Sequence, residues 1–265
     1  QAGNRAMYQE YANKYSENIR VYGIAVKSKE LMGVLHLKGM IFDDLLLYSG
    51  ASINNVYLHY QEKYRLDRYH LLTSKPLADS FCQFLQTTFV DTGVAIDLST
   101  PQILPAKQQK ICGKRTKALL RKASYSIPTE QSAGGIQVTP LVGCGRRNNH
   151  LNQQILTCIA QSESQITLFT PYFNFPRKVT KQISLALKRG VNMTLVVGDK
   201  TANDFYIADE DKFSTIGVIP YIYEQILRRF VKRWQKFIYN KQLTIKLWRD
   251  GNNSYHLKGM SVDDK

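Results

Sequence analysis

A nine-residue motif that occurs twice constrains this chain more than any other feature. The first copy, HLKGMIFDD, runs from His36 to Asp44, and the second, HLKGMSVDD, runs from His256 to Asp264. The copies match at seven of nine positions, although the chain contains only five histidines. Solenoid repeats recur about every 20–50 residues, far more closely than these two copies. The sequence therefore predicts two similar halves, each carrying one copy of the motif.

The boundary between the halves is expected in the stretch from Leu98 to Thr139. This stretch contains three prolines, a glycine pair and a basic run, which is typical of a connection. We assign residues 1–125 to the first half and residues 126–265 to the second. We also expect the start of the first half and the end of the second half to lie outside this chain, in a longer protein.

Apolar patterns predict an α/β fold. In the second half, Gln165–Thr170 and Val191–Val197 have the apolar character of buried strands, and Arg177–Arg189 has the periodicity of an amphipathic helix. Strand, helix and strand in this order predict a parallel crossover. An apolar stretch and then a polar turn precede each copy of the motif, with the apolar stretches at Ile19–Val26 and Leu243–Trp248. We therefore predict that each copy lies on the second strand of a hairpin.

The residue types of the motif indicate chemistry rather than packing. On a strand, side chains two residues apart project from the same face, so His36 and Lys38 are expected to point together. Asp43 follows near the end of that strand, where a carboxylate can fix the tautomer of an imidazole or pair with a cation. The second copy offers the same groups at His256, Lys258 and Asp263. A duplicated hairpin kept for packing is the alternative, but unpaired His, Lys and Asp are costly to bury.

Two histidines and two lysines in one pocket suit reactions at phosphorus. The ammonium groups can neutralise the anionic oxygens of a phosphodiester or pyrophosphate while charge redistributes in the transition state. One neutral imidazole can attack phosphorus while the other gives or takes a proton. Such a site requires no metal ion, and we expect neither a metal nor another cofactor. A divalent metal held by the paired aspartates is the alternative.

The charge of the chain indicates an anionic partner. The chain contains 36 Lys and Arg residues against 21 Asp and Glu, which gives a formal net charge of +15. Nucleic acid, an anionic lipid surface and a phosphorylated substrate all fit this charge. Four widely spaced cysteines favour a reducing compartment, and no apolar run approaches the ~20 residues of a membrane-spanning helix. We therefore expect a soluble or peripheral protein.

The pattern His-x-Lys-x₄-Asp, present at His36 and again at His256, resembles the phospholipase D superfamily. The resemblance extends to the bacterial phosphatidylserine synthases of that superfamily and spans most of the chain. The further stretches that carry it are Gly33–Met40, Tyr48–Asn55, Leu66–His70, Val138–Gly143, Thr170–Asn174 and Gly198–Tyr206. Together these stretches are far more specific than the short motif alone.

The resemblance implies a fold, a reaction and roles for the motif residues. It implies two phospholipase D-like α/β/α sandwich halves with the active site at their interface. It also implies transfer of a phosphatidyl group from CDP-diacylglycerol to L-serine, with release of CMP, through a covalent phosphatidyl-histidine. By the same resemblance His36 is the nucleophile and His256 the general acid and base. Cardiolipin-synthase-like transfer and phospholipase D-type hydrolysis use the same motifs and stay open as alternatives, and a nucleic-acid-binding module is an alternative of another class.

Four further residues are candidates for binding substrate. Many superfamily members carry Gly-Ser-x-Asn after the first aspartate, whereas residues 50–54 here read GASIN, so either Ser52 or Asn54 is expected to contact phosphate oxygens. The loop that begins at Gly198 follows a predicted strand, where α/β proteins usually bind ligands. Asn203 and Asp204 in this loop are candidates for binding cytidine or the serine ammonium group. An ordinary surface turn is the alternative.

A basic amphipathic helix is predicted from Tyr221 to Ile238. Its cations gather opposite its apolar residues, at Arg228, Arg229, Lys232, Arg233 and Lys236. Such a helix can lie at an anionic phospholipid surface, although its apolar stripe can equally pack on the protein's own sheet. We expect a cytoplasmic protein that associates peripherally with the inner face of the cytoplasmic membrane. Nucleic-acid binding is expected only as a charge effect, and the sequence leaves the oligomeric state open.

Overall fold

The computed structural model describes residues 4–15, 18–25, 35–60, 62–101, 103–126, 135–145, 148–208 and 214–263. The chain divides into two compact units, Gln1–Leu46 with Leu72–Leu151 and Leu47–Leu71 with Asn152–Lys265. This division differs from the split at 125/126 that we expected from the sequence. The stretch from Leu47 to Leu71 precedes that split by many residues, yet it packs with the second half of the chain.

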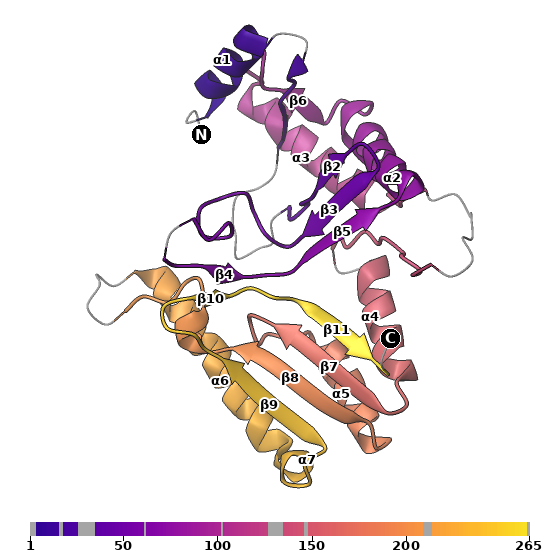
Figure 1. The fold of residues 1–265 in the computed structure, drawn as a ribbon, viewed down its shortest axis with the longest axis vertical. Coiled ribbons are helices and arrows are strands. Elements are labelled where there is room, and N and C mark those ends of the chain that lie inside the picture. The colour runs from indigo at the N-terminus through magenta and orange to yellow at the C-terminus, as the bar shows by residue number, and fades with distance from the viewer. Residues whose placement is uncertain are drawn as a thin grey trace. The chain divides into compact units, whose positions relative to one another are not determined.

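The first unit combines helices with short strands, as Figure 1 shows. Strand β1 (Tyr22–Ile24) pairs antiparallel with β6 (Ala95–Asp97). Strands β2 (Met40–Phe42), β3 (Leu45–Ser49) and β5 (Tyr69–Thr73) form a three-stranded sheet, and the division between the units falls within β3 and β5. The helices are α1 (Arg5–Tyr15), α2 (Lys75–Leu85), which continues into a π-helical turn at Gln86–Val90, and α3 (Ala106–Leu120).

The second unit is built on a four-stranded sheet of order β11-β7-β8-β9. Strands β7 (Gln165–Thr170), β8 (Asn192–Gly198) and β9 (Leu243–Trp248) are parallel, and β11 (Gly259–Val262) is antiparallel to β7. Helix α5 (Arg177–Lys188) connects β7 to β8. The predicted parallel crossover is therefore confirmed, and so is the α/β class.

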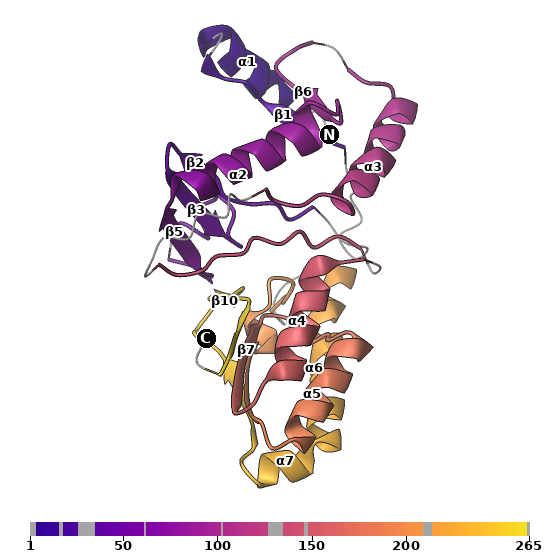
Figure 2. The same cartoon turned by 90° about the vertical axis from the view of Figure 1, so that its right-hand side faces the viewer.

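Helices cover one face of this sheet, as Figure 2 shows for α4 (His150–Gln161), α5, α6 (Ile219–Arg233) and α7 (Gln235–Tyr239). Alternate residues of β8 turn toward them, so Met193, Leu195 and Val197 are buried in the core of the unit. Trp234 separates α6 from α7 and packs into the same core with only 6% of its surface exposed. Within the described ranges, no helix has the length and apolar character to cross a bilayer.

Among the described residues, neither copy of the motif forms the expected hairpin; the turn expected before the first copy, at residues 27–30, lies outside them. Strand β9, which precedes the second copy, pairs with β8, whereas β11, which belongs to that copy, pairs with β7, so the two strands occupy opposite edges of the sheet. In the first copy, β1 pairs with β6 and β2 with β3. The hairpin prediction is therefore wrong. An apolar run, a polar turn and a second apolar run are locally compatible with a hairpin. In the structure, however, β9 pairs in parallel with β8, which lies further away in the sequence.

The repeat is nevertheless visible in the backbone. Strand β2 ends before Asp43 and strand β11 ends before Asp263, and these aspartates adopt φ values of 52° and 51°. This left-handed conformation is unfavourable for most residues with a side chain, but Asp tolerates it. Both copies therefore end in the same strand-terminating turn.

Candidate active site

The position of His256 follows from a short parallel ladder within the second unit. Strand β10 (Ser254–Tyr255) pairs with β4 (Arg65–Leu66), with Tyr255 opposite Leu66. The His256 N–H donates to the Leu66 carbonyl at 2.9 Å and extends the ladder by one bond. Because the strands are parallel and in register, the next residue of each, His256 and Asp67, come side by side. The histidine and lysine of the motif thus lie in the connection between β10 and β11 rather than within a strand.

Asp67 and His256 form a buried pair. Asp67 Oδ2 lies 2.8 Å from His256 Nδ1, and the two side chains expose only 4% and 7% of their surfaces. Tyr57 Oη also lies 3.1 Å from Nδ1. A carboxylate can only accept, so we assign the Nδ1 proton to the bond with Asp67. This tautomer leaves Nε2 as the nitrogen that can exchange a proton with a substrate.

Lys258 folds back over His256. Its ammonium group donates to the His256 carbonyl at 2.7 Å and lies 2.8 Å from Nδ1 and 2.9 Å from Nε2. A point nearly equidistant from both ring nitrogens lies off the lone-pair axis of each, so neither contact is a well-directed hydrogen bond. The ammonium group is therefore held by the carbonyl and stays close to both nitrogens, where it can also bind an anion.

Arg68 fixes the backbone of the motif. Its guanidinium Nη2 donates to the Lys258 carbonyl at 2.7 Å. A Cβ atom at position 259 would overlap that guanidinium, whose Nη2 lies where the side chain would begin. The glycine of the motif, Gly259, therefore makes room for Arg68, and the geometry explains why this position carries no side chain.

Two tyrosines pack edge-on against the imidazole and connect it to an ion pair. The ring of Tyr57 lies 5.6 Å and the ring of Tyr172 lies 6.4 Å from that of His256, both at 75°. The Tyr172 hydroxyl donates to Asp204 at 2.9 Å, and Asp204 also lies 3.0 Å from Arg65 Nε. The Arg65 guanidinium in turn covers the Tyr57 ring at 4.9 Å. His256, Tyr57, Arg65, Asp204 and Tyr172 thus form a closed ring in which each side chain interacts with the next.

The electrostatics of the site keep Asp67 ionised and both tyrosines neutral. Burial by itself would raise the pKa of Asp67, but the hydrogen bonds from His256 and the Arg68 backbone, with the charge of Lys258, hold the pKa below its ordinary value. Burial raises the pKa of Tyr57. Burial and the adjacent Asp204 carboxylate raise the pKa of Tyr172 much further. The phenols therefore remain hydrogen-bond donors at neutral pH.

Asp263 contacts backbone rather than the imidazole. Its carboxylate accepts N–H bonds from Glu163, Ser164 and Gln165 at 2.8–2.9 Å, and a further bond from the Ser164 hydroxyl at 2.9 Å. The three backbone bonds lower the pKa of Asp263 far below its usual range. From the sequence we expected Asp263 to fix the imidazole or to pair with a cation. In the structure Asp67 is the carboxylate at His256 Nδ1, whereas Asp263 accepts bonds from the start of β7 and the two residues before it.

The first copy of the motif lies in the first unit. His36 is exposed and Lys38 half-buried, in the segment that leads into β2, and Asp43 follows β2 in its left-handed turn. The structure therefore describes His36, Lys38 and Asp43 within one unit and His256, Lys258 and Asp263 within the other.

Asn54 positions Tyr57 in the second unit. Its side-chain oxygen accepts the Tyr57 N–H at 3.1 Å, and its own N–H donates to the Ser52 carbonyl at 3.0 Å. Ser52 is half-buried and Asn54 is exposed. The expected contact of either residue with phosphate oxygens stays a prediction, but Asn54 acts on the site through the turn that carries Tyr57.

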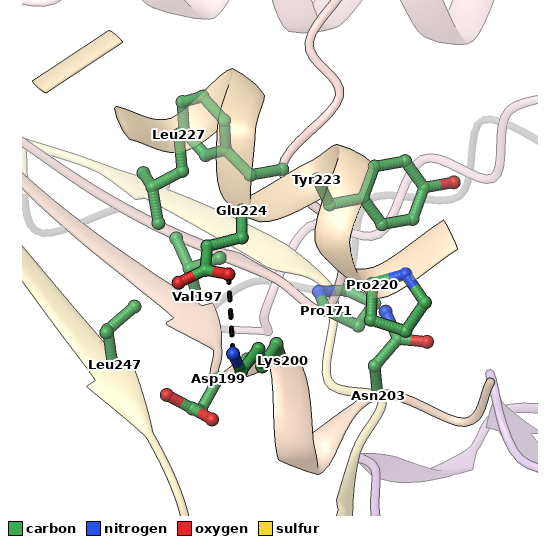
Figure 3. Close-up of a pocket in the computed structure, with 12 residues that line it drawn as sticks. Pro171, Val197, Asp199, Lys200, Asn203, Pro220, Tyr223, Glu224, Leu227 and Leu247 are labelled. Atoms are coloured by element: carbon green, nitrogen blue, oxygen red, sulfur yellow. Dashed lines mark ion pairs between the residues drawn. The ribbon is translucent and has the colours of Figure 1, made fainter. Parts of the chain in front are cut away.

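Asn203 and Asp204 occupy different environments. The buried Asn203 accepts the Phe205 N–H at 2.9 Å and lines a cavity of about 50 Å³ together with Lys200, Tyr223 and Glu224 (Figure 3). That cavity has room for a few water molecules but not for a nucleobase. Asp204, in contrast, lies in the set of side chains around His256. Of the two loop candidates, only Asp204 is connected to the histidine by contacts that the structure shows.

The basic helix shows both features that the sequence indicated. Phe230 and Trp234 pack into the core of the second unit, so the apolar stripe does cover the protein's own sheet. All five cations are exposed: Arg228, Arg229, Lys232, Arg233 and Lys236. The predicted helix is divided at Trp234, so four of these cations lie on α6 and Lys236 lies on α7. Exposed apolar side chains precede the cations on α6, with Tyr221 at 41%, Ile222 at 51% and Ile226 at 37% exposure. The outer surface of α6 is therefore apolar in its first half and basic in its second.

Metal ligands do not gather in the part of the chain that the structure describes. Among those residues, no three His, Cys, Asp or Glu side chains are arranged to hold a metal ion.

Sequence reasoning missed the residues that surround His256. We assigned no role to five of them: Tyr57, Arg65, Asp67, Arg68 and Tyr172. Asp67 and Arg68 nevertheless lie in the stretch Leu66–His70, which carries the superfamily resemblance. That stretch was the available signal. It gave no indication of its partner, because the pairing with His256 depends on a two-residue ladder between distant segments.

Known proteins resemble this chain over most of its length. It is 43% identical over 92% of its length to the CDP-diacylglycerol--serine O-phosphatidyltransferase of Haemophilus influenzae, and 41% identical over 94% to that of Escherichia coli. It covers 54% and 55% of those proteins, so the chain spans about half the length of the curated relatives it matches. A probable CDP-diacylglycerol--glycerol-3-phosphate 3-phosphatidyltransferase of Dictyostelium discoideum is 23% identical.

A solved structure and a protein family agree with these relatives. The crystal structure of phosphatidylserine synthase from Haemophilus influenzae matches 98% of this chain with a TM-score of 0.89 at 41% identity, and the match covers 60% of that protein. Residues 155–265 match the family described as "Cardiolipin synthase, PLD-like domain". The resemblance to the phospholipase D superfamily is thereby confirmed: residues 155–265 match a PLD-like domain family, and the chain shares its fold with part of a bacterial phosphatidylserine synthase.

Proposed function

We propose that this chain takes part in the transfer of a phosphatidyl group from CDP-diacylglycerol to L-serine, which yields phosphatidylserine and CMP. The observation that carries the proposal is the buried pair of His256 and Asp67 beside Lys258, in a fold shared with a phosphatidylserine synthase. An oriented imidazole next to an ammonium group suits acid–base chemistry at a phosphate.

In the first step, His36 attacks the phosphorus atom that carries the diacylglycerol group. A nitrogen–phosphorus bond forms, the bond to the CMP oxygen breaks, and CMP leaves with the electron pair. A phosphate monoester has a second pKa of about 6, so this leaving group needs little help from a proton. Lys38 and Lys258 neutralise the oxygens of the phosphorus centre as charge redistributes.

In the second step, the serine hydroxyl attacks the same phosphorus atom and the bond to His36 breaks. A serine hydroxyl is a very weak acid, so it needs a base, and His256 accepts its proton at Nε2. Asp67 stabilises the imidazolium that forms, because its carboxylate already accepts the Nδ1 proton. The role of His256 is therefore larger in the second step than in the first.

The reaction is tested with the purified full-length protein and CDP-diacylglycerol, with and without serine. We expect phosphatidylserine and CMP to appear together and only when serine is present. Serine should also outcompete glycerol 3-phosphate, the acceptor for which the Dictyostelium relative is named. If product formed only with glycerol 3-phosphate, the acceptor would be glycerol 3-phosphate and not serine. Salt-sensitive DNA binding without turnover would favour a binding module.

The roles of the histidines are tested with His256→Ala. This variant should release a burst of CMP and accumulate phosphatidyl-histidine at His36, with slow turnover afterwards. Peptide mapping under conditions that preserve phosphohistidine locates the adduct. An adduct at His256 in the unmodified protein would reverse the two assignments.

We further propose that the protein acts on the inner face of the cytoplasmic membrane as a peripheral, cytoplasmic enzyme. The lipid donor carries two acyl chains and stays in the bilayer, so the enzyme must reach it there. The exposed cations of α6 follow the exposed Tyr221, Ile222 and Ile226, an arrangement that suits an anionic lipid surface. Each cation near such a surface contributes about 1 kcal/mol.

A further inference from the structure

A cavity of about 230 Å³ lies directly beside the first copy of the motif, within the first unit. Leu37, Lys38 and Gly39 of the motif form one side of it. The remaining lining residues come from β2, β3, α2 and the segment after α3, and they are Ile41, Leu46, Phe81, Phe84, Leu85 and Tyr125. Lys38 is the single charged residue among the nine, so the cavity is an apolar space with one lysine in its lining.

The far wall of the cavity is a packed aromatic surface. The Tyr125 ring stacks on Phe84 at 4.3 Å and lies 4.6 Å from Phe81. Phe84 belongs to the core of the first unit, and Leu46 is 1% exposed. These side chains are held by their neighbours, so the space is not closed by a simple rotation of the wall.

The two copies of the motif differ where this cavity begins. They are identical from histidine to methionine, but the next residue is Ile41 in the first copy and Ser261 in the second. Ile41 lines the cavity, whereas in the second copy Met260 and Val262 pack against the core of their own unit. The apolar substitution therefore occurs in the copy that has an open apolar space beside its lysine.

We propose that this cavity binds a segment of an acyl chain of the lipid donor, next to the phosphate that Lys38 holds. The proposal rests on the proposed function, since it assigns a subsite to the same donor. A phosphate attracted to the Lys38 ammonium group would direct the attached diacylglycerol into the apolar space. With a volume below the ~300–1,000 Å³ of pockets that enclose a whole drug-sized ligand, the cavity takes one segment of a chain.

A nucleobase fits the cavity less well than an alkyl chain. Cytosine carries hydrogen-bonding groups that lose water when they enter an apolar space, and seven of the nine lining residues are apolar or aromatic. Unpaired polar groups are costly to bury, whereas methylene groups gain free energy on burial. The chemistry of the lining therefore favours the lipid part of the donor over its nucleotide part.

The test uses inorganic phosphate, butyl phosphate and octyl phosphate as probes, with binding to the full-length protein measured by calorimetry. Octyl phosphate should bind at least about 10-fold more tightly than butyl phosphate, because each buried methylene adds affinity. Leu85→Trp places a larger side chain in the lining of the cavity and should reduce this ratio to about twofold. Binding of inorganic phosphate should not change in that variant.

Leu185→Trp is the matched control. Leu85 and Leu185 lie on helices with 39% and 40% exposure, but Leu185 lies on α5 of the other unit. The control should keep the full preference for octyl phosphate. Ile41→Ser gives the first copy the residue of the second copy and should also reduce the ratio, which keeps the test informative if Leu85→Trp does not fold.

Equal affinity for butyl and octyl phosphate would overturn the proposal, as would a ratio that neither variant changes. Weaker CMP binding in Leu85→Trp, with octyl phosphate unaffected, would show that the cavity takes the nucleobase instead. These measurements do not depend on turnover. If the protein prefers octyl phosphate but forms no phosphatidylserine, the proposed subsite is supported and the proposed reaction is refuted.

Discussion

Asp67 Oδ2 lies 2.8 Å from His256 Nδ1, although 189 residues separate the two along the chain. Burying charged partners costs several kcal/mol for each ion, so such a pair is a poor device for stability alone. Its geometry instead fixes one tautomer of the imidazole and aligns the ring. The pair therefore gives the second copy of the motif a partner that the motif itself does not contain.

Replacement of Asp67 tests this positioning role. Asp67→Asn should lower kcat by about 10²-fold or more, within the ~10²–10⁴-fold range of general acid–base catalysis, with little change in the KM for serine. The lowered pKa of Asp67 keeps its carboxylate charged at neutral pH, so the wild type has a negative charge next to Nδ1 that the variant lacks. Wild-type kcat in Asp67→Asn would refute the role.

The contact between Arg68 and the motif backbone gives a second prediction. Gly259→Ala should displace the guanidinium from the Lys258 carbonyl and lower kcat by about 10–100-fold, since small misplacements of catalytic groups are costly. Arg68→Ala should reproduce the loss. The double variant should be no worse than either single variant. Additive losses in this cycle would mean that the glycine is required for another reason.

Asp263 should contribute to stability rather than to chemistry. Asp263→Ala should lower Tm by about 2–4 °C, because the variant loses the bonds to residues 163–165 and keeps an unfavourable left-handed backbone. Asp263→Asn should lose less. The depressed pKa of Asp263 means that its contribution is fully present above the ordinary pKa near 4 and is lost as the pH falls through the folded value. Thermal melts of the wild type and Asp263→Asn should therefore converge at very low pH. A large loss of kcat in Asp263→Asn with normal Tm would contradict this assignment.

Activity should not require a divalent metal. We expect full turnover of CDP-diacylglycerol and serine after treatment with EDTA, because in the proposed reaction the ammonium groups of Lys38 and Lys258 supply the positive charge. The measurement is CMP release before and after chelation and dialysis. Loss of activity that one specific ion restores would show that a metal takes part.

The outer surface of α6 should control membrane binding. Replacing Arg228, Arg229, Lys232, Arg233 and Lys236 together with glutamine should weaken sedimentation with anionic vesicles and leave turnover in detergent mixed micelles largely intact. Wild-type binding should be weak on neutral vesicles and should decrease with salt, since screening acts over ~8–10 Å. If the variant sediments like the wild type, α6 only packs against the sheet and does not bind the membrane. The basic segment from Lys107 to Lys122 would then be the better candidate for the membrane contact.

The sequence predicted those parts of the fold that local patterns determine. The strands at Gln165–Thr170 and Asn192–Gly198 and the helix between them follow from apolar periodicity, and the structure confirms them. The superfamily resemblance is also confirmed, because it rests on long stretches rather than on spacing alone. Pairing between distant strands carries no such local signal. The hairpin prediction failed for that reason, as β9 and β11 each take a partner outside the turn that connects them.

The candidate site was predicted in part, for the same physical reason. His256 and Lys258 were identified because the motif is duplicated, and the structure places them in contact. Asp67 was not identified, because nothing in the sequence near it shows that Leu66 pairs with Tyr255 in a parallel ladder. That pairing is what brings Asp67 beside His256. The aspartate of the motif was the natural choice from the sequence, but the left-handed turn at Asp263 directs its carboxylate to the backbone of residues 163–165.

The ladder between β4 and β10 also has a consequence for synthesis. Ribosomes add about 5–20 residues per second, so the segment that contains Asp67 is made about 10–40 s before the strand that pairs with it. During that time β4 is an unpaired strand, which in many proteins invites pairing with another chain. Two residues, Arg65 and Leu66, make a very short edge, and one of them is charged. A strand this short can remain unpaired during translation, because its edge is too short for a neighbouring nascent chain to bind to it.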